Sequence, residues 1–341
     1  MIQDIIGKLI ERRDLTEEES AAAMTCVMDG EATPAQIAGL LVGLRMKGET
    51  PDEITGFVRV MRDKAVRIKP KRYPLADTCG TGGDRVKTFN VSTAAAFVVA
   101  GAGVAVAKHG NRSVTSKCGS ADVLEALDIT LEMEPEDVSR CIDEVGIGFM
   151  FAPRFHPAMK HAAPVRRELG VRTVFNLLGP LTNPAGATAQ VLGVPGPEWA
   201  EPLARVLANL GAERAFVVHG ACGVDEISTA GETLVHEVRD GEVNSYSIRP
   251  EEFGLTCAEP ESISGGDAAE NARTLVGILE GNAGPKRDIV LLNAAAAIAA
   301  GGAAADLAEG LSVATEAIDS GAALARLREM QAFCAARKTT Q

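Results

Sequence analysis

Aromatic residues are scarce in this sequence, and long unbroken hydrophobic runs are missing. The chain of 341 residues contains 10 Phe, 2 Tyr and 1 Trp, although 46% of its residues are hydrophobic. Its core must therefore consist mainly of small aliphatic side chains, and the chain is long enough to bury such a core in two lobes. The most apolar segments, 94–107 and 289–305, are interrupted by Gly or rich in Ala. We therefore expect core elements there and no membrane partner.

Paired cysteines are also missing, because the seven cysteines are scattered and form no CxxC motif. Their odd number and spacing argue against a disulfide framework and a zinc site, and favour reduced thiols in a cytoplasmic protein. The first residues, MIQDIIGKLIERR, have no basic start followed by an apolar stretch, so we expect no signal peptide.

Positive charge is in deficit, since 34 Lys and Arg stand against 46 Asp and Glu, for a net charge of −12. A surface of this sign repels the phosphates of a nucleic acid, so we expect no nucleic-acid partner. An anionic substrate would need a local pocket lined by positive side chains or backbone amides.

The first seventy residues have helix signals only. Thr16 with Glu19 forms a capping box before an apolar run. Two Thr-Pro dipeptides, at 33–34 and 50–51, place an N-cap before a proline in the first helical position. Gly30 and Gly48 stand where helices should end. The predicted helices are 2–13, 17–29, 34–47 and 51–66.

From residue 71 onward, short apolar strands alternate with helices. Strands are predicted near 75–78, 104–107, 149, 189–194 and 215–218, and helices from 91, near 120–127 and at 135–145. This order predicts an α/β lobe with a mostly parallel central sheet and helices on both faces. Residues 230–250 alternate and predict an antiparallel hairpin with Asp240-Gly241 at its turn.

The stretch 156–184 has a helical pattern broken at Pro164, which could return the chain to the helical lobe. The expected domains are therefore a helical domain of residues 1–70, completed by about 160–184, and an α/β domain of residues 71–159 and 185–341.

Two polar loops follow one another early in the α/β region. DTCGTGGD at 77–84 has three glycines, which let backbone N–H groups converge on a ligand. It lacks the P-loop and GxGxxG spacings, so a flexible turn is the plain alternative. FNVST at 89–93 opens a helix whose start could bind phosphate, although Asn90 or Ser92 could simply be its N-cap. The Cys79 thiol would be reactive only if loop amides lowered its pKa, whereas a buried cysteine is usually inert.

Two further loops follow predicted strands. KHGNRSVTSKCGS at 108–120 combines three cations with several hydrogen-bonding side chains. The carboxyl ends of parallel strands meet in one crevice. We therefore expect these loops together to form the local pocket that an anionic substrate of an acidic protein would need. The fourth loop, HGACGVDE at 219–226, follows the strand predicted at 215–218. Its Asp225 and Glu226 would ordinarily be surface acids, but beside a phosphate pocket they are candidate Mg²⁺ ligands.

Together these loops resemble the anthranilate phosphoribosyltransferase family. The resemblance is densest between residues 77 and 226, and Cys118 and Cys222 depart from it where Ser and Asp are usual. The matching strings are DTCGTGGD, FNVST, KHGNRSVTSKCGSADVLEAL, FAPRFHPAMKHAAPVRRELGVRTVFNLLGPLTNP and VDE. The resemblance implies a nucleoside phosphorylase/phosphoribosyltransferase-like fold, with a smaller all-helical lobe hinged to a larger α/β lobe. It also implies a homodimer formed through the helical lobes.

The family's reaction moves the phosphoribosyl group of phosphoribosyl pyrophosphate (PRPP) to the amine of anthranilate, in tryptophan biosynthesis. The resemblance implies anthranilate contacts from Gly80, Asn111 and Arg166. It implies Mg²⁺, two ions per monomer, held by Ser92, Asp225 and Glu226. The implied PRPP contacts are Gly80, Gly83, Asp84, Thr88, Asn90, Val91, Ser92, Thr93, Lys108, His109, Gly110, Asn111, Arg112, Ser113, Val114, Thr115, Ser116 and Ser120.

Individual roles within this set remain open. Lys108 is a point charge suited to a phosphate, and the planar fork of Arg166 fits a carboxylate, although Arg166 could be a surface residue like its neighbour Arg167. His109 is a candidate proton acceptor, with a structural or substrate-contact role as the alternative. His156 is interpreted as the start of a helix.

Three alternative functions also remain. A pyrimidine nucleoside phosphorylase shares the two-lobe plan and uses phosphate where the transferase forms pyrophosphate, but the VDE acids and the long FAPRF…NLLGPL block favour the transferase. A nucleic-acid-binding relative is disfavoured by the negative charge. A non-enzymatic metabolite sensor is the third alternative, and turnover would exclude it.

Overall fold

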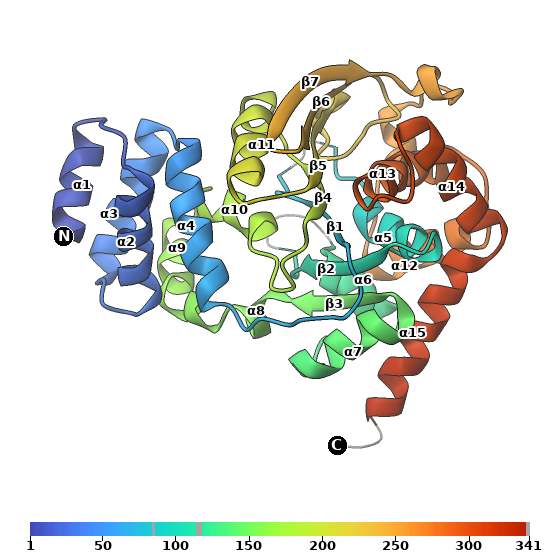
Figure 1. The fold of residues 1–341 in the computed structure, drawn as a ribbon, viewed down its shortest axis with the longest axis horizontal. Helices are drawn as coiled ribbons and strands as arrows, with labels where there is room; N and C mark the ends of the chain where they lie inside the picture. The colour runs from blue at the N-terminus through green and yellow to red at the C-terminus, as the bar shows by residue number, and fades with distance from the viewer. Residues whose placement is uncertain (84–85, 114–117, 339–341) are drawn as a thin grey trace.

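Figure 1 shows a helical lobe at one end of the molecule and a larger lobe built around a sheet. The computed structural model describes residues 1–83, 86–113 and 118–338. The helical lobe begins with α1 (Ile2–Ile10), α2 (Glu17–Met28), α3 (Pro34–Lys47) and α4 (Pro51–Lys64). These are the helices predicted for the first seventy residues. Only α1 ends clearly earlier than expected, because the backbone turns into the left-handed region at Arg12, where φ is 57°.

The predicted helix starts are confirmed by their hydrogen bonds. Thr16, Thr33 and Thr50 each accept a bond from the amide three residues on, and the side chain at that position bonds back to the cap. Each box satisfies two of the amides that a helix start leaves open. The helices end as predicted near Gly30 and Gly48, where φ is 76° and 92°.

Seven strands form one sheet in the described chain, in the order β3-β2-β1-β4-β5-β6-β7. Strands β1 to β5 pair in parallel, and β6 and β7 form the predicted antiparallel hairpin. Asp240 and Gly241 stand at its turn with φ of 52° and 81°, which this kind of tight turn requires. The strands are β1 (Leu75–Gly80), β2 (Ala105–Gly110), β3 (Ile147–Phe151), β4 (Ala189–Gly193), β5 (Arg214–Gly220), β6 (Thr233–Arg239) and β7 (Glu242–Ile248).

The two faces of the sheet belong to two hydrophobic cores. On β5, Phe216 and Val218 join one core, whereas Ala215 and Val217 join the other. This division follows from the two-residue repeat of a strand. The first core also contains α5 (Val91–Gly101), α13 (Pro285–Ala300) and α15 (Ala322–Lys338), and the second contains α1 to α4 and α11 (Ala200–Asn209). Helices therefore cover both faces, as predicted.

The remaining helices complete these layers. Helix α6 packs against α12, α14 against α13, and α7 against β3. Short 3-10 turns connect several elements. The helices are α6 (Ser120–Ala126), α7 (Pro135–Val145), α12 (Ala268–Leu279) and α14 (Leu307–Asp319), and the turns are η3 (Pro197–Trp199), η4 (Ala221–Gly223), η5 (Pro250–Phe253) and η6 (Pro260–Ile263).

The stretch 156–184 is more broken than its helical pattern suggested. Pro164 lies in the first turn of α9 rather than at a break, because a proline there loses no helical hydrogen bond. Val165 and Leu181 are buried in the same core as α1 to α4. The domain boundaries proposed from the sequence stay a prediction. The pieces are η1 (Pro157–His161), α9 (Ala163–Leu169), α10 (Phe175–Leu178) and η2 (Gly179–Leu181), and the short helix α8 (Ala152–Phe155) comes directly before them.

In the described chain, no helix combines the length and the apolar character that crossing a membrane would require.

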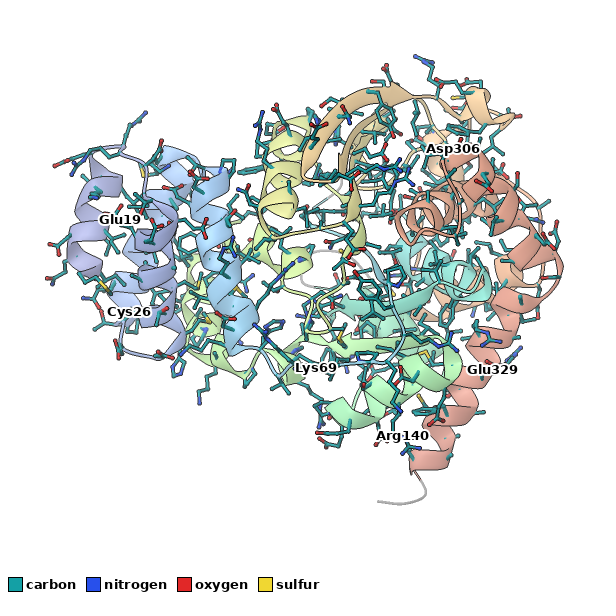
Figure 2. All side chains as sticks on the ribbon, viewed as in Figure 1. Glu19, Cys26, Lys69, Arg140, Asp306 and Glu329 are labelled. Atoms are coloured by element: carbon teal, nitrogen blue, oxygen red, sulfur yellow. The ribbon has the colours of Figure 1, made fainter. Side chains whose placement is uncertain are left out.

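The capping carboxylate of α4, Glu53, is buried and bonded to three other residues, whereas the corresponding carboxylate of α2, Glu19, is partly exposed. Glu53 is fully buried and accepts bonds from Leu15 N at 2.9 Å, Thr50 N at 2.9 Å and Lys47 Nζ at 3.0 Å. Glu19, labelled on α2 in Figure 2, is partly exposed.

We expect Glu53→Ala to lower the free energy of unfolding by about 3–5 kcal/mol, because it leaves a buried ammonium and two amides without this partner. Glu19→Ala, the matched change at the same capping position, should cost only about 0.5–1 kcal/mol. Urea denaturation followed by circular dichroism measures both. Equal losses in the two variants would contradict this account of α4.

Candidate active site

The candidate site lies at the carboxyl ends of the parallel strands. From β1 the chain proceeds to β2 and β3 on one side, and later returns to β4 on the other side of β1. Loops on the two sides of such a switch leave in opposite directions and open a crevice, which is where ligands bind in open α/β sheets. The loops after β1, β2 and β5, singled out from the sequence, all begin at this edge.

The glycine loop after β1 packs against Asp225. Gly82 N–H donates to Asp225 Oδ2 at 2.9 Å. A Cβ at Gly80 would lie 2.2 Å from the same oxygen, and one at Gly193 would lie 1.6 Å from the Asp225 backbone oxygen. Side chains at these two positions would displace the acid. Burial raises the pKa of Asp225, and the bond from Gly82 opposes that rise. Asp84, expected to contact PRPP, lies outside the described residues.

Glu226 holds the start of α5. Its Oε1 accepts the Ser92 N–H at 3.2 Å, and Lys108 Nζ lies 3.4 Å from Ser92 Oγ. Ser92, Asp225 and Glu226, the proposed metal ligands, therefore lie in one neighbourhood. Their hydroxyl and carboxylate oxygens are the hard donors that Mg²⁺ prefers. Among the described residues, no group of three or more His, Cys, Asp or Glu side chains is placed to hold a metal ion by itself. Oxygens of the substrate and of water would therefore complete the coordination shell of an Mg²⁺ ion bound by Ser92, Asp225 and Glu226. The residues fit the ion.

Lys108 lies beneath these loops instead of projecting from them. It is 3% exposed, and its ammonium donates to the Thr78 carbonyl oxygen. Burial lowers its pKa, while Asp77 opposes that effect. Asp77 is itself buried, which raises its pKa to about 6, and it accepts a bond from Asn183 Nδ2 at 2.8 Å. A direct contact between Lys108 and a phosphate stays a prediction.

The residues around the start of α5 differ in burial and in hydrogen bonding. Val91 and Thr93 are 0% and 1% exposed, so their side chains belong to the core and only their backbone could meet a ligand. Thr88 forms an isolated bridge with Ser264. Asn90 occupies the N-cap position, but its side chain makes no capping bond, so the N-cap interpretation of that side chain is wrong.

The loop after β2 is organised by carboxylates of α6. The Arg112 guanidinium bonds Glu125 and Asp122, which raises its pKa, so a phosphate would have to compete with these partners. Ser113 N–H also donates to Asp122, at 3.1 Å. Ser120 Oγ donates to the Asn111 carbonyl oxygen at 3.3 Å, and a Cβ at Gly110 would lie 2.2 Å from that hydroxyl. Val114, Thr115 and Ser116 lie outside the described residues.

A cavity of about 510 Å³ adjoins these loops and extends to the helical lobe. Gly80, Asn111 and Arg166, the residues matched to anthranilate contacts, all line it. The lining consists of Met61, Cys79, Gly80, His109, Gly110, Asn111, Ala152, Pro153, His156, Pro157, Met159, Lys160, Ala163, Arg166, Phe175, Gly179, Pro180 and Thr182. A mostly apolar pocket with a few polar groups suits a small aromatic ligand.

Arg166 is the notable cation of this cavity. Its guanidinium lies 5.0 Å from the centre of the Phe175 ring, and no described carboxylate lies within ion-pair distance of it. Burial lowers its pKa. Arg167, in contrast, is exposed and does not line the cavity. The structure therefore separates two adjacent arginines that the sequence alone distinguished only by resemblance.

Two buried histidines, His109 and His156, lie side by side in the wall of the cavity, with ring centres 5.1 Å apart. Burial lowers the pKa of His109 to about 3, with a further contribution from His156, whose own pKa burial lowers to about 4. Both rings are therefore neutral at physiological pH. Their Nε2 atoms are buried without a hydrogen-bond partner in the described structure, and both residues line the cavity. His156 does precede η1, as predicted, but its place in the cavity was missed.

Other residues at the site gave no recognisable signal in the sequence. Arg172 lies against the glycine loop, because a Cβ at Gly83 would come within 2.0 Å of its guanidinium. Asn183 bridges Asp77 and the Ala107 carbonyl oxygen. The idea of an activated Cys79 is contradicted, since burial raises the pKa of this thiol well above its ordinary value.

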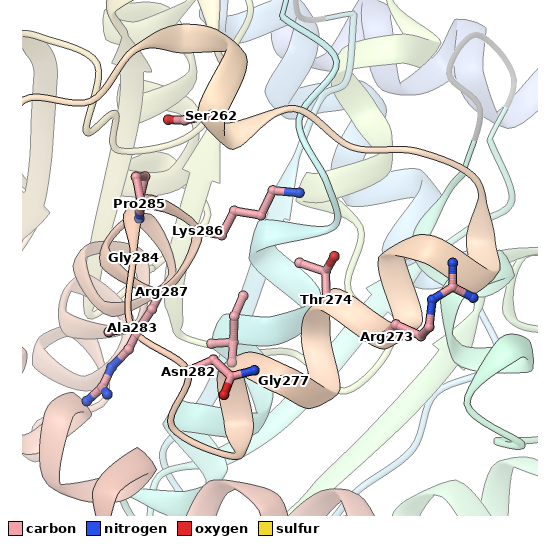
Figure 3. Close-up of a pocket in the computed structure, with 11 residues that line it drawn as sticks. Ser262, Arg273, Thr274, Gly277, Asn282, Ala283, Gly284, Pro285, Lys286 and Arg287 are labelled. Atoms are coloured by element: carbon pink, nitrogen blue, oxygen red, sulfur yellow. The ribbon is translucent and has the colours of Figure 1, made fainter.

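A second cavity, of about 350 Å³, is lined by residues of α12 and of the start of α13 (Figure 3). Ser262, Thr274 and Lys286 are among its lining residues. It adjoins the FNVST loop, because the Lys286 ammonium lies 5.5 Å from the centre of the Phe89 ring.

The chain matches two parts of a known family. Residues 3–65 match the glycosyl transferase family, helical bundle domain, and residues 72–324 match the glycosyl transferase family, a/b domain. Anthranilate phosphoribosyltransferase of Symbiobacterium thermophilum is 59% identical over 329 residues, covering 96% of each chain. The same enzyme of Pelotomaculum thermopropionicum is 57% identical, covering 98% of this chain and 96% of its own.

Solved structures agree. Anthranilate phosphoribosyltransferase from Thermus thermophilus is 50% identical with a TM-score of 0.92, covering 96% of this chain and 98% of its own. The Saccharomyces cerevisiae enzyme in complex with PRPP and Mg is 27% identical with a TM-score of 0.89, covering 98% of each chain. Given these identities over nearly the whole length, the chain belongs to the anthranilate phosphoribosyltransferase family.

Proposed function

We propose that this protein transfers the phosphoribosyl group of PRPP to the amine of anthranilate, giving N-(5-phosphoribosyl)anthranilate and pyrophosphate, in tryptophan biosynthesis. The observation that carries the proposal is the 510 Å³ cavity, where Arg166 adjoins the loops after β1 and β2. Relatives of that name match nearly the whole chain, and a yeast relative has been solved with PRPP and Mg.

The reaction requires alignment and charge neutralisation more than a strong base. The aromatic amine is a weak nucleophile, whereas pyrophosphate leaves readily once its charge is neutralised, through an oxocarbenium-like transition state. We propose that amides of the glycine loop and the start of α5 hold the phosphates. Ser92, Asp225 and Glu226 would hold Mg²⁺, which when bound neutralises charge on the pyrophosphate.

The anthranilate would lie in the cavity with its carboxylate on Arg166. Phe175 already packs on the guanidinium, which keeps the fork in place for two parallel hydrogen bonds. Asn111 could orient the amine. A histidine of pKa about 3 is too weak a base to hold a proton at neutral pH, so we propose that His109 contacts the substrate through its unpartnered Nε2.

Several finer points belong to this proposal. We propose two Mg²⁺ ions per monomer and a homodimer formed through the helical lobe, where Ile10 and Met46 are 75% and 71% exposed. We also propose a cytoplasmic location, which the seven unpaired cysteines support.

Loss of anthranilate fluorescence on mixing protein, PRPP, Mg²⁺ and anthranilate tests the proposed reaction. We expect turnover only when all four are present. Cleavage of a pyrimidine nucleoside by phosphate, without need for Mg²⁺ and with anthranilate untouched, would instead identify a nucleoside phosphorylase. Absence of either reaction would reject both enzymes.

The acidic pair should set the dependence on magnesium. In the double variant Asp225→Asn, Glu226→Gln, the side-chain oxygens can still accept the bonds from Gly82 and Ser92, while two negative charges are lost. We expect no turnover at ordinary Mg²⁺ concentrations, with steady-state rates measured across a magnesium titration. Glu232→Gln with Glu242→Gln removes two charges from exposed positions of the same lobe and should leave the titration unchanged. Near-normal activity of the first variant without excess metal would refute the assignment.

Arg166 should act on anthranilate and not on PRPP. Loss of a charge-assisted pair typically costs about 1.5–3 kcal/mol, so Arg166→Ala should raise KM for anthranilate roughly tenfold to 150-fold. KM for PRPP should stay within about threefold, because its phosphates bind elsewhere. Arg167→Ala is the matched control and should change neither constant by much. A variant that weakens PRPP and spares anthranilate would show that the aromatic substrate is misplaced.

A further inference from the structure

The loop that leads into α5 is braced by a distant segment of the chain. Gly265 N–H donates to the Lys87 carbonyl oxygen at 2.9 Å, and Phe89 N–H donates to the Ile263 carbonyl oxygen at 3.4 Å. A Cβ at Gly265 would lie 2.6 Å from Phe89 Cα, so this close approach requires glycine. Figure 3 shows the chain running from Ser262 over to α12, which carries Thr274. Residues 263–271 are here called the brace.

The brace reaches the carboxamide of Asn90 through Asn271. Asn90 Oδ1 accepts from Asn271 Nδ2 at 3.0 Å and from Cys118 Sγ at 3.3 Å, and Asn90 Nδ2 donates to the Cys118 carbonyl oxygen at 3.4 Å. These three bonds determine which end of the Asn90 carboxamide is oxygen and which is nitrogen. In the flipped orientation, the Asn90 NH₂ group would point at the Asn271 NH₂ group and the Cys118 thiol, which are themselves donors. One N–H of Nδ2 is not used by these bonds.

Asn271 is itself held in place. It is 3% exposed, in the first turn of α12, and its Oδ1 accepts the Gly266 N–H at 2.8 Å. Its side chain therefore links the backbone of the brace to Asn90. A buried amide of this kind is costly unless both its ends are bonded, so its position is well determined.

Cys118 provides the other support from the loop after β2. Burial raises the pKa of its thiol to about 11, so the sulfur keeps its proton and stays a donor at neutral pH. Asn90 is thus fixed between two elements, α12 and the loop before α6, and neither contact helps to cap α5.

We infer that Asn271 and Cys118 are positioning residues that orient the Asn90 carboxamide for PRPP. This inference rests on the proposed function, because Asn90 enters it as a PRPP contact. A polar group held in its binding orientation loses less freedom when the ligand arrives, which favours affinity. The Asn271 side chain also bonds Cys118, but its proposed effect on PRPP passes through Asn90 and should therefore depend on the presence of the Asn90 side chain.

The test is a double-mutant cycle on PRPP affinity, measured by calorimetry in the presence of Mg²⁺. Asn271→Ala should raise Kd for PRPP about tenfold, equivalent to about 1.4 kcal/mol, and leave KM for anthranilate within about twofold. In the Asn90→Ala background the same change should add less than about twofold, since coupled residues are not additive. A merely structural role would give the same loss in both backgrounds.

Matched variants complete the experiment. Cys118→Ala should weaken PRPP about threefold and Cys118→Ser, which retains a donor, should restore wild-type affinity. If Asn271→Ala does not fold, the same cycle is made with Cys118→Ala. Asn282→Ala, at an exposed position in the turn that follows α12, is the control and should bind PRPP like wild type.

The outcomes separate the two proposals. Unchanged PRPP affinity in Asn271→Ala, or an equal loss with and without the Asn90 side chain, overturns the inference. Wild-type protein that binds PRPP but does not consume anthranilate rejects the proposed acceptor, while the cycle still decides the inference. Wild-type protein that binds no PRPP overturns both.

Discussion

Two adjacent carboxylates, buried in the loop after β5, require hydrogen-bond donors from other parts of the chain. Asp225 takes the Gly82 N–H and Glu226 takes the Ser92 N–H. These bonds draw the loop after β1 and the start of α5 onto the loop after β5. Because buried charges are costly unless they are hydrogen-bonded, the three segments hold one another in place. The bare backbone at Gly80 and Gly193 follows from the same constraint, since a Cβ at either would collide with Asp225.

In a protein of net charge −12, the groups that we propose to bind anions thus lie in one region. Amides and the buried Lys108 lie on one side of the crevice, and Arg166 lies on the other. Residues of both lobes line the cavity, and the core of α1 to α4 is continuous with one face of the sheet. Met61 of α4 lines the same cavity as Gly80 and His109, so the relative packing of the lobes determines its shape.

Local signals predicted much of the fold. The threonine caps at 16, 33 and 50 act within three residues, and the Asp240-Gly241 turn acts within two, so each is readable from neighbouring letters. Alternation of short strands with helices predicted the parallel sheet for the same reason. The segment 156–184 was harder, because its apolar residues pack against a lobe more than a hundred residues away in sequence, and its short turns have no regular period.

The sequence by itself determined where the chemistry is concentrated, because glycines, polar runs and adjacent acids at strand ends are local features. It did not determine what each side chain does. The tertiary structure decided that Arg112 pairs with α6, that Lys108 is buried under the loops, and that Asn90 bonds Asn271 instead of capping α5. The physical reason is that a polar side chain takes the partner that packing brings to it, and residues 90 and 271 meet only after the whole lobe has formed.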